Sequence, residues 1–170
     1  MIAIEIDAAH EHFLGAQHLH IETWNRETTL VVYPLATGDR GVFNKGDLDW
    51  GTRVLIENAE VPRGGVLLDL GCGSGAIAAA LATLRPDATV WAVDVNERAV
   101  DVARRTMQLN GLTNVRVALA DEVPHDLRFD GIWSNPPIRV GKDELHHLLS
   151  TWLARLAAAG TADLVVHGTK

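Results

Sequence analysis

The sequence lacks the features that mark exported and membrane-spanning proteins. Its single cysteine, Cys72, has no second cysteine with which to form an internal disulfide. No stretch approaches the roughly 18 consecutive apolar residues of a membrane helix, and the first residues carry acids where a signal peptide carries basic side chains. We therefore expect a soluble, cytoplasmic protein with no membrane partner.

Positive charge is also scarce. The chain has 15 basic and 22 acidic residues, for a formal net charge of −7 at pH 7. Bulk electrostatics therefore do not attract this protein to nucleic acid, and a nucleic-acid substrate would have to be held by a local patch. Four of the eight histidines lie close together, at His10, His12, His18 and His20, but without the spacing of a recognised metal motif. We expect no metal site.

The length of 170 residues suits a single domain with a real core, perhaps with a small appendage. We expect an N-terminal extension over residues 1–46 and a main domain over residues 47–170. The extension contains the β-branched, apolar run Thr28 to Tyr33, which predicts a strand, and turn residues that precede Val42 and Phe43. The strand Thr28 to Tyr33 and a short second strand that begins at Val42 and Phe43 predict an N-terminal β-hairpin.

The main domain alternates between helical and strand patterns. It opens with an amphipathic helix from Leu48 to Ala59, with Asp47 as its cap. The predicted strands are Val66–Leu70, Thr89–Val93, Val115–Leu119, Gly131–Trp133 and Ala162–Val166. The predicted helices between them are Gly75–Leu84, a helix capped by Asn96 and ended by Gly111, and an apolar stripe from Leu145 to Leu156. This order predicts an α/β fold with a parallel sheet and a ligand crevice at the carboxyl ends of its strands.

A glycine-rich turn follows the first of these strands. Gly71, Gly73 and Gly75 let the chain turn tightly and let a ligand approach the backbone, and Asp69 stands two residues before them. The spacing is GxGxG and not the GxGxxG of dinucleotide binders, which disfavours an NAD-dependent oxidoreductase. This pattern resembles motif I of the class I S-adenosylmethionine-dependent methyltransferases. The resemblance implies that these four residues bind S-adenosylmethionine.

Two further acids stand at strand ends. Asp94 ends the second strand, where a carboxylate can accept hydrogen bonds from both ribose hydroxyls of an adenosine. Asp121 follows the third strand, where class I methyltransferases often have an acid beside the adenine amino group. We expect both residues to bind the cofactor.

The motif Asn135-Pro136-Pro137-Ile138 follows the fourth strand. It resembles the NPP(Y/F) motif of methyltransferases that act on planar amino groups of bases or of glutamine amides. The side-chain oxygen of Asn135 and the carbonyl of Pro136 can accept the two amino hydrogens, and proline supplies a stiff backbone with no competing donor. The resemblance makes Asn135 and Pro136 the catalytic candidates.

The residues after this asparagine depart from the family pattern. Ile138 stands where an aromatic side chain usually stacks on the base or amide. Arg139 and Lys142 could bind a phosphate at the mouth of the site, or they could be solvated loop charges. A degenerate domain that binds cofactor without catalysis therefore stays open as an alternative.

The segment GVFNKGDLDWGT, at positions 41–52, narrows the resemblance. Together with motif I and the sequence NPPIRVGK, it resembles the small-domain (MTS) methyltransferase family, which contains the 16S ribosomal RNA guanine-N2 methyltransferases. The likeness runs from about Thr28 to His167, and in the family this loop packs over the cofactor. Weaker site candidates in it are Phe43, Lys45, Asp49 and Thr52.

The resemblance predicts an S-adenosylmethionine-dependent methyltransferase that acts on an exocyclic amine of a nucleobase, with guanine N2 in ribosomal RNA as the preferred target. Protein-glutamine methylation is the alternative substrate. It also predicts the sheet order 3-2-1-4-5, with the terminal strand pair of the class missing from a C-terminally shortened chain. The strand Ala162–Val166 would then have an open edge. We expect this edge to pair in a homodimer, to be covered by the N-terminal segment, or to limit solubility.

Overall fold

The computed structural model describes residues 3–6, 17–23, 26–32, 49–136 and 142–165. The elements in chain order are β1 (Ala3–Ile6), β2 (Gln17–Thr23), β3 (Arg26–Val32), α1 (Trp50–Asn58), β4 (Val66–Leu70), α2 (Ala76–Leu84), β5 (Thr89–Asp94), α3 (Glu97–Leu109), β6 (Val115–Leu119), β7 (Phe129–Ser134), α4 (Lys142–Leu153) and β8 (Leu156–Leu164). A 3₁₀ turn, Ala120–Glu122, follows β6.

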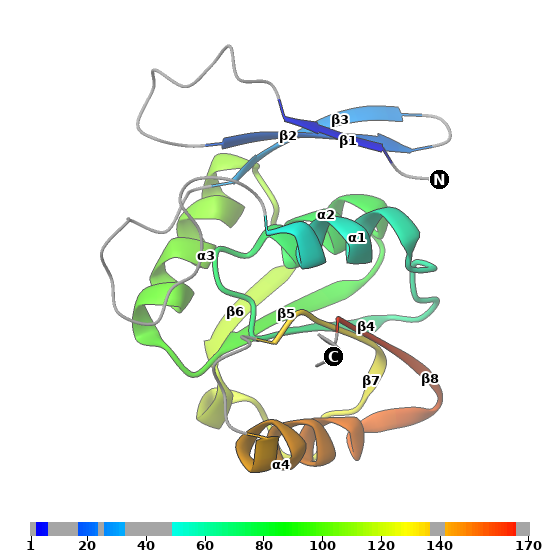
Figure 1. The fold of residues 1–170 in the computed structure, drawn as a ribbon, viewed down its shortest axis with the longest axis vertical. Coiled ribbons are helices and arrows are strands. Elements are labelled where there is room, and N and C mark those ends of the chain that lie inside the picture. The colour runs from blue at the N-terminus through cyan, green and yellow to red at the C-terminus, as the bar shows by residue number, and fades with distance from the viewer. Residues whose placement is uncertain (1–2, 7–16, 24–25, 33–48, 137–141, 166–170) are drawn as a thin grey trace.

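Five of the strands form a parallel sheet in the order β6-β5-β4-β7-β8. When these five strands are numbered from 1 to 5 along the chain, beginning with β4, the order is 3-2-1-4-5. The predicted α/β topology is therefore confirmed. The helices α1, α2 and α3 lie on one face of the sheet and α4 lies on the other (Figure 1). The chain reverses its direction of winding at β4, and an α/β sheet binds its ligands at such a switch point, beyond the carboxyl ends of the strands.

The N-terminal strands form a separate antiparallel sheet in the order β1-β2-β3, beside the helix layer (Figure 1). An N-terminal hairpin is present, and in the described residues it is formed by β3 with the preceding β2. The sequence of β2 fits this pairing, because Leu19 and Ile21 alternate with polar residues and only two residues separate β2 from β3. Val42 and Phe43 lie outside the described residues.

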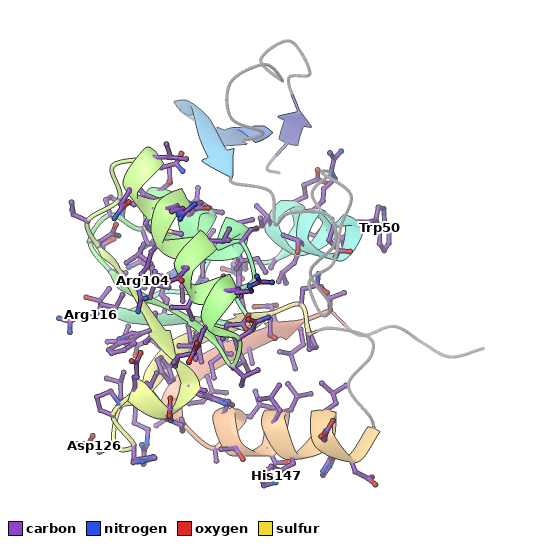
Figure 2. The ribbon with its side chains drawn as sticks, turned by 90° about the vertical axis from the view of Figure 1, so that its left-hand side faces the viewer. Trp50, Arg104, Arg116, Asp126 and His147 are labelled. Carbon is purple, nitrogen blue, oxygen red and sulfur yellow. The ribbon has the colours of Figure 1, made fainter. Side chains whose placement is uncertain are left out.

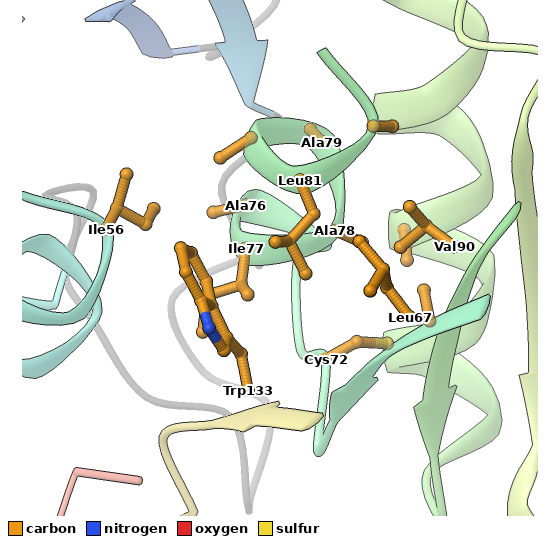
Figure 3. Close-up of a cluster of buried hydrophobic side chains, with 14 of the residues drawn as sticks. Ile56, Leu67, Cys72, Ala76, Ile77, Ala78, Ala79, Leu81, Val90 and Trp133 are labelled. Carbon is orange, nitrogen blue, oxygen red and sulfur yellow. The ribbon is translucent and has the colours of Figure 1, made fainter. Parts of the chain in front are cut away.

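The core on the α1 to α3 side is built around the small side chains of α2. In β4, Leu67 and Leu68 point to opposite faces and both are fully buried, as expected for a central parallel strand. Residues 78–80 of α2 are alanines without solvent exposure, so this helix can approach the sheet closely. Figure 3 shows Trp133 of β7 beneath this helix, where it fills the space between Ile77 and Ile56.

On the opposite face, α4 covers the sheet with Trp152. Its ring lies 6.2 Å from that of Phe129 in β7, and the Arg155 guanidinium lies 4.5 Å from the Trp152 ring centroid. The predicted helical stripe extends too far, because α4 ends at Leu153 and Leu156 begins β8. A leucine at that position fits the helix spacing and the strand equally well, so the pattern alone does not separate the two.

The helix caps set two boundaries. The α1 helix begins at Trp50 and its cap is Asp49 and not the predicted Asp47, because the Asp49 carboxylate accepts from the Thr52 N–H at 3.2 Å. The predicted cap of α3 is confirmed, since the Asn96 side chain accepts from the Arg98 N–H at 3.0 Å.

Among the described strands, β8 lies at one edge of the five-stranded sheet, with β7 as its only partner. The described N-terminal strands pair with one another and leave this edge uncovered. Homodimer formation and limited solubility through the edge stay predictions. Within the part of the chain that the structure describes, no helix is both long enough and apolar enough to cross a membrane.

Candidate active site

The glycine-rich turn lies at the carboxyl end of β4, where it leads into α2. Gly71, Gly73 and Gly75 have φ angles of 72°, 53° and 82°, in the left-handed region that favours glycine. The N–H groups of Gly71 and Cys72 both donate to the Val93 carbonyl, at 2.8 and 3.0 Å. A side chain at Gly71 would meet nothing within 4 Å, so open space lies beside the turn.

Asp94 at the end of β5 is joined directly to this turn. One carboxylate oxygen accepts from the Gly73 N–H at 3.0 Å and the other from the Asn96 N–H at 2.9 Å. Each oxygen keeps a second lone pair, so the carboxylate can still accept from a ligand. The structure therefore brings Asp94 and the glycines together, as the sequence predicts.

Asp69 lies inside the protein, one strand position before the end of β4. Its Oδ2 accepts from the Ala78 N–H at 2.9 Å, whereas its buried Oδ1 has no partner among the described residues. Burial raises the pKa of Asp69 from its ordinary value of 3.8 to about 8; the bond from Ala78 opposes this rise and the charge of Asp94 adds to it. Asp69 is therefore a buried acid that carries its proton at neutral pH.

Asn135 follows β7, the strand on the other side of β4. The Ser134 hydroxyl donates to the Leu70 carbonyl at 2.7 Å, which fixes the end of β7 against the glycine-rich turn. The Asn135 amide nitrogen donates to the Asp49 carboxylate and to the Thr52 hydroxyl, the latter at 3.0 Å. Its carbonyl oxygen accepts no hydrogen bond from any described residue. Both catalytic candidates are thus at the site, with Asn135 partly exposed and Pro136 buried.

For the remaining candidate residues, the structure describes no hydrogen bond to the glycine-rich turn, Asp94 or Asn135. Asp121 lies exposed in the 3₁₀ turn after β6, two residues beyond Leu119, the register partner of Asp94. Lys142 is the first residue of α4, and its side chain is not described. Ile138, Arg139, Phe43 and Lys45 lie outside the described residues.

Sequence reasoning gave too little weight to the first turn of α1. Asp49 and Thr52 rank there as weak candidates, yet both bind the Asn135 amide. Gly51 was not singled out, although a Cβ at this position would lie 3.0 Å from the Asn135 carbonyl oxygen and 2.9 Å from a Val165 methyl group. The local signal at this turn is Asp49 itself, because aspartate is a preferred residue type at the N-terminal cap of a helix.

The residues of this edge fit S-adenosylmethionine. Asp94 presents carboxylate oxygens beside the turn, open space lies next to Gly71, and the Asp69 Oδ1 is a buried polar atom without a partner in the described chain. On the other side of β4, the carbonyl oxygen of Asn135 has no hydrogen-bond partner among the described residues, and its amide nitrogen is held by Asp49 and Thr52. One half of the edge can hold an adenosine and the other half can orient a hydrogen-bond donor.

Comparison with known proteins agrees with this arrangement. The model of the methyltransferase small domain matches residues 35–169. An uncharacterized protein of Bacillus subtilis, YbxB, is 40% identical over 134 residues, which are 76% of this chain and 67% of that protein. Ribosomal RNA small subunit methyltransferase C of Shewanella halifaxensis is 38% identical over 128 residues. These are 75% of this chain and 37% of the relative, so the chain spans little more than a third of that protein.

Solved structures extend the likeness to the fold. The Thermus thermophilus 16S rRNA N2 G1207 methyltransferase RsmC, in complex with AdoMet and guanosine, has a TM-score of 0.67 and 27% identity over 88% of this chain and 41% of that chain. TrmN from Thermus thermophilus has a TM-score of 0.55 and 32% identity over 66% of this chain and 36% of that chain. The chain therefore belongs to the methyltransferase small domain family of S-adenosylmethionine-dependent enzymes.

Proposed function

We propose that this chain transfers the methyl group of S-adenosylmethionine to an exocyclic amine of a nucleobase in ribosomal RNA, with guanine N2 as the target. The observation that carries the proposal is Asn135, whose amide nitrogen is bound by α1 while its carbonyl oxygen is unpaired among the described residues. The RsmC structure, with AdoMet and guanosine bound, supports the choice of substrate. Methyltransferase C relatives support ribosomal RNA as the partner.

In this proposal the cofactor is held on the β4 and β5 side. Asp94 accepts from the ribose hydroxyls, and the turn through Gly71 and Gly73 admits the cofactor beside the backbone. Asp121 lies toward the adenine. Bound S-adenosylmethionine supplies an electrophilic methyl group on a positively charged sulfur.

The chain positions the amine on the β7 side. The Asn135 oxygen and the Pro136 carbonyl accept the two amino hydrogens, so the nitrogen lone pair is turned toward the methyl group. As the nitrogen–carbon bond forms, the sulfur–carbon bond breaks and the amine releases one proton to solvent. No strong base is required, and catalysis consists of orientation.

Substitution of Asn135 tests the proposal. We expect Asn135→Ala to keep its affinity for S-adenosylmethionine while methyl transfer falls by about 10² or more, because the substrate loses an acceptor and the cofactor loses nothing. Calorimetry measures cofactor binding, and transfer of a labelled methyl group to ribosomal subunits or naked ribosomal RNA measures catalysis. Asn58→Ala, at the exposed end of α1, is the matched control. Equal losses of binding and transfer in Asn135→Ala would make Asn135 a structural residue.

The labelled product distinguishes the alternatives. Recovery of the label as N2-methylguanosine after nuclease digestion supports the proposed target. Label in total protein, recovered as methylglutamine, would instead identify a protein-glutamine methyltransferase. Cofactor binding without transfer to either substrate would leave a degenerate binding domain.

A further inference from the structure

The first turn of α1 contacts Asn135 on its inner side. Trp50 projects outward from this turn and is 71% exposed (Figure 2), whereas Thr52 is buried and its hydroxyl accepts from the Asn135 amide at 3.0 Å. Asp49 caps the helix and its Oδ2 accepts from the same amide nitrogen. The two contacts join parts of the chain that lie 86 and 83 residues apart in sequence.

These contacts fix which way the Asn135 amide points. A carboxylate accepts hydrogen bonds and cannot donate one, so only the nitrogen end of the amide can face Asp49. The amide has two N–H bonds, and Asp49 and Thr52 provide an acceptor for each. Rotation of the amide by 180° would break the bond to Asp49 and place two acceptor oxygens against each other. The Thr52 hydroxyl can donate as well as accept, so Asp49 sets the direction of the amide and Thr52 holds its second N–H.

The carbonyl end has room because residue 51 is a glycine. A Cβ there would lie 3.0 Å from the Asn135 oxygen, which is closer than nearly all real contacts of a Cβ atom. Gly51 is the second residue of α1, a position where alanine is ordinarily the better helix former. Its hydrogen side chain therefore leaves space that the Asn135 oxygen occupies.

Asp49 is itself held in place by the helix that it caps. Its Oδ2 accepts from the Thr52 N–H at 3.2 Å and its carbonyl accepts from the Arg53 N–H at 3.0 Å. The helix is anchored by Leu55 and Ile56, which are buried in the core beside α2. The orientation of the amide is thus tied to a packed element and not to a free side chain.

We propose that Asp49 and Thr52 are positioning residues that lock the Asn135 amide with its carbonyl oxygen turned to the substrate amine. The lock matters because the flipped amide would present N–H donors to the amino group of the substrate, which is also a donor. The identity of the substrate group rests on the proposed function, whereas the lock itself is a property of the chain. Asp49 thereby has two tasks, capping α1 and orienting Asn135.

Two substitutions separate these tasks. Asp49→Ser keeps a residue that caps helices well, but its shorter side chain no longer reaches the amide. Thr52→Val keeps the shape of the buried side chain and removes the hydroxyl acceptor. We expect each to lower kcat by about tenfold while the Kd for S-adenosylmethionine stays within about twofold. Matched controls are Asp143→Ser in the first turn of α4 and Thr83→Val on α2.

The side-chain amide signals of Asn135 in a nitrogen–proton NMR spectrum report on the lock without any substrate. They are assigned by their absence in Asn135→Ala. We expect the two N–H signals to shift and to exchange faster with solvent in Asp49→Ser and in Thr52→Val, and to be unchanged in both controls. Unchanged signals in both variants would overturn the lock.

A double-mutant cycle then tests whether the lock acts through Asn135. If it does, Asp49→Ser and Thr52→Val cause no further loss of kcat in the Asn135→Ala background. Losses that add in this background would overturn the proposal, as would variants with kcat within about twofold of the wild type. If the wild-type chain binds the cofactor but methylates neither RNA nor protein, the proposed function fails, and the NMR signals alone decide the lock.

Discussion

Asp94 shows how one carboxylate can serve both the protein and its ligand. It accepts from the N–H groups of Gly73 and Asn96, and in the proposed function it also accepts from the cofactor ribose. We expect Asp94→Ala to weaken S-adenosylmethionine binding at least about tenfold, because one or two charge-assisted hydrogen bonds of roughly 1.5 to 3 kcal/mol each are lost. Calorimetry measures the change, with the exposed Asp101→Ala as control. NAD binding by the wild type, without S-adenosylmethionine binding, would refute this role.

Asp69 predicts a dependence of stability on pH. Its pKa is raised to about 8 in the folded protein, above the ordinary 3.8 of the unfolded chain. Between these values the folded state retains a proton that the unfolded state has lost. Its contribution to stability is therefore complete below about pH 4 and is lost as the pH rises to about 8, by up to about 1.4 kcal/mol per pH unit.

Urea unfolding at several pH values between 5 and 8 measures this slope. Asp69→Asn keeps an acceptor for the Ala78 N–H but cannot titrate, so we expect the decline with pH to be flatter in the variant. The comparison uses the slopes and not the absolute stabilities, because the buried amide also changes the packing. Identical slopes would show that Asp69 is ionised in the folded protein.

Among individual residues, the sequence predicts those candidate site residues that stand in a recognisable motif next to a predicted strand. The glycines of the turn, Asp69 and Asp94 lie at or near strand ends that hydrophobic runs identify, so their meeting at one edge of the sheet follows from the topology. The contact between Asp49 and Asn135 could not be predicted in this way. This contact depends on how α1 packs beside the end of β7. A short sequence pattern does not predict the distance between two residues that are 86 positions apart.

Among elements, α4 covers its face of the sheet with one buried aromatic side chain and three partly buried leucines, Leu148, Leu149 and Leu153. Trp152 is buried against Phe129 and beneath Arg155. We expect Trp152→Ala to lower the free energy of unfolding by about 3–5 kcal/mol, because it leaves a cavity between helix and sheet. The exposed His147→Ala on the same helix, labelled in Figure 2, should stay within about 0.5 kcal/mol. Chemical denaturation measures both, and equal effects would show that α4 contributes little to the core.

Element boundaries were predicted well where a chemical stop signal was present and poorly where it was absent. Gly111, with a φ of 62°, lies just beyond the end of α3, as predicted. No such residue separates Leu153 from Leu156, so the helical stripe ran on into β8. In β2 the alternation is short, with Leu19 and Ile21 as its only apolar members, so the strand has a weak sequence signal.

For the whole molecule, the division into residues 1–46 and 47–170 predicts what a truncated chain can do. The strands β1 to β3 pair only with one another among the described strands and add nothing to the five-stranded sheet. We expect a chain without residues 1–32 to unfold cooperatively and to bind S-adenosylmethionine within about threefold of the full chain. Circular dichroism during urea titration and calorimetry test this. Loss of the cooperative transition would show that the N-terminal sheet belongs to the main core.

The order of strands in the sheet has a consequence for the protein during synthesis. The turn after β4, with Asp94 of β5, is complete in sequence well before β7 leaves the ribosome, yet β7 must then insert beside β4. Until that happens, the nascent chain has an unpaired apolar edge at β4. Asp49 also lacks its partner Asn135, which follows it by 86 residues in the chain. In the proposed function, a growing polypeptide thus acquires the residues that bind the cofactor before those that orient the substrate, and a ligand that binds the first group early can stabilise the partial sheet while translation finishes.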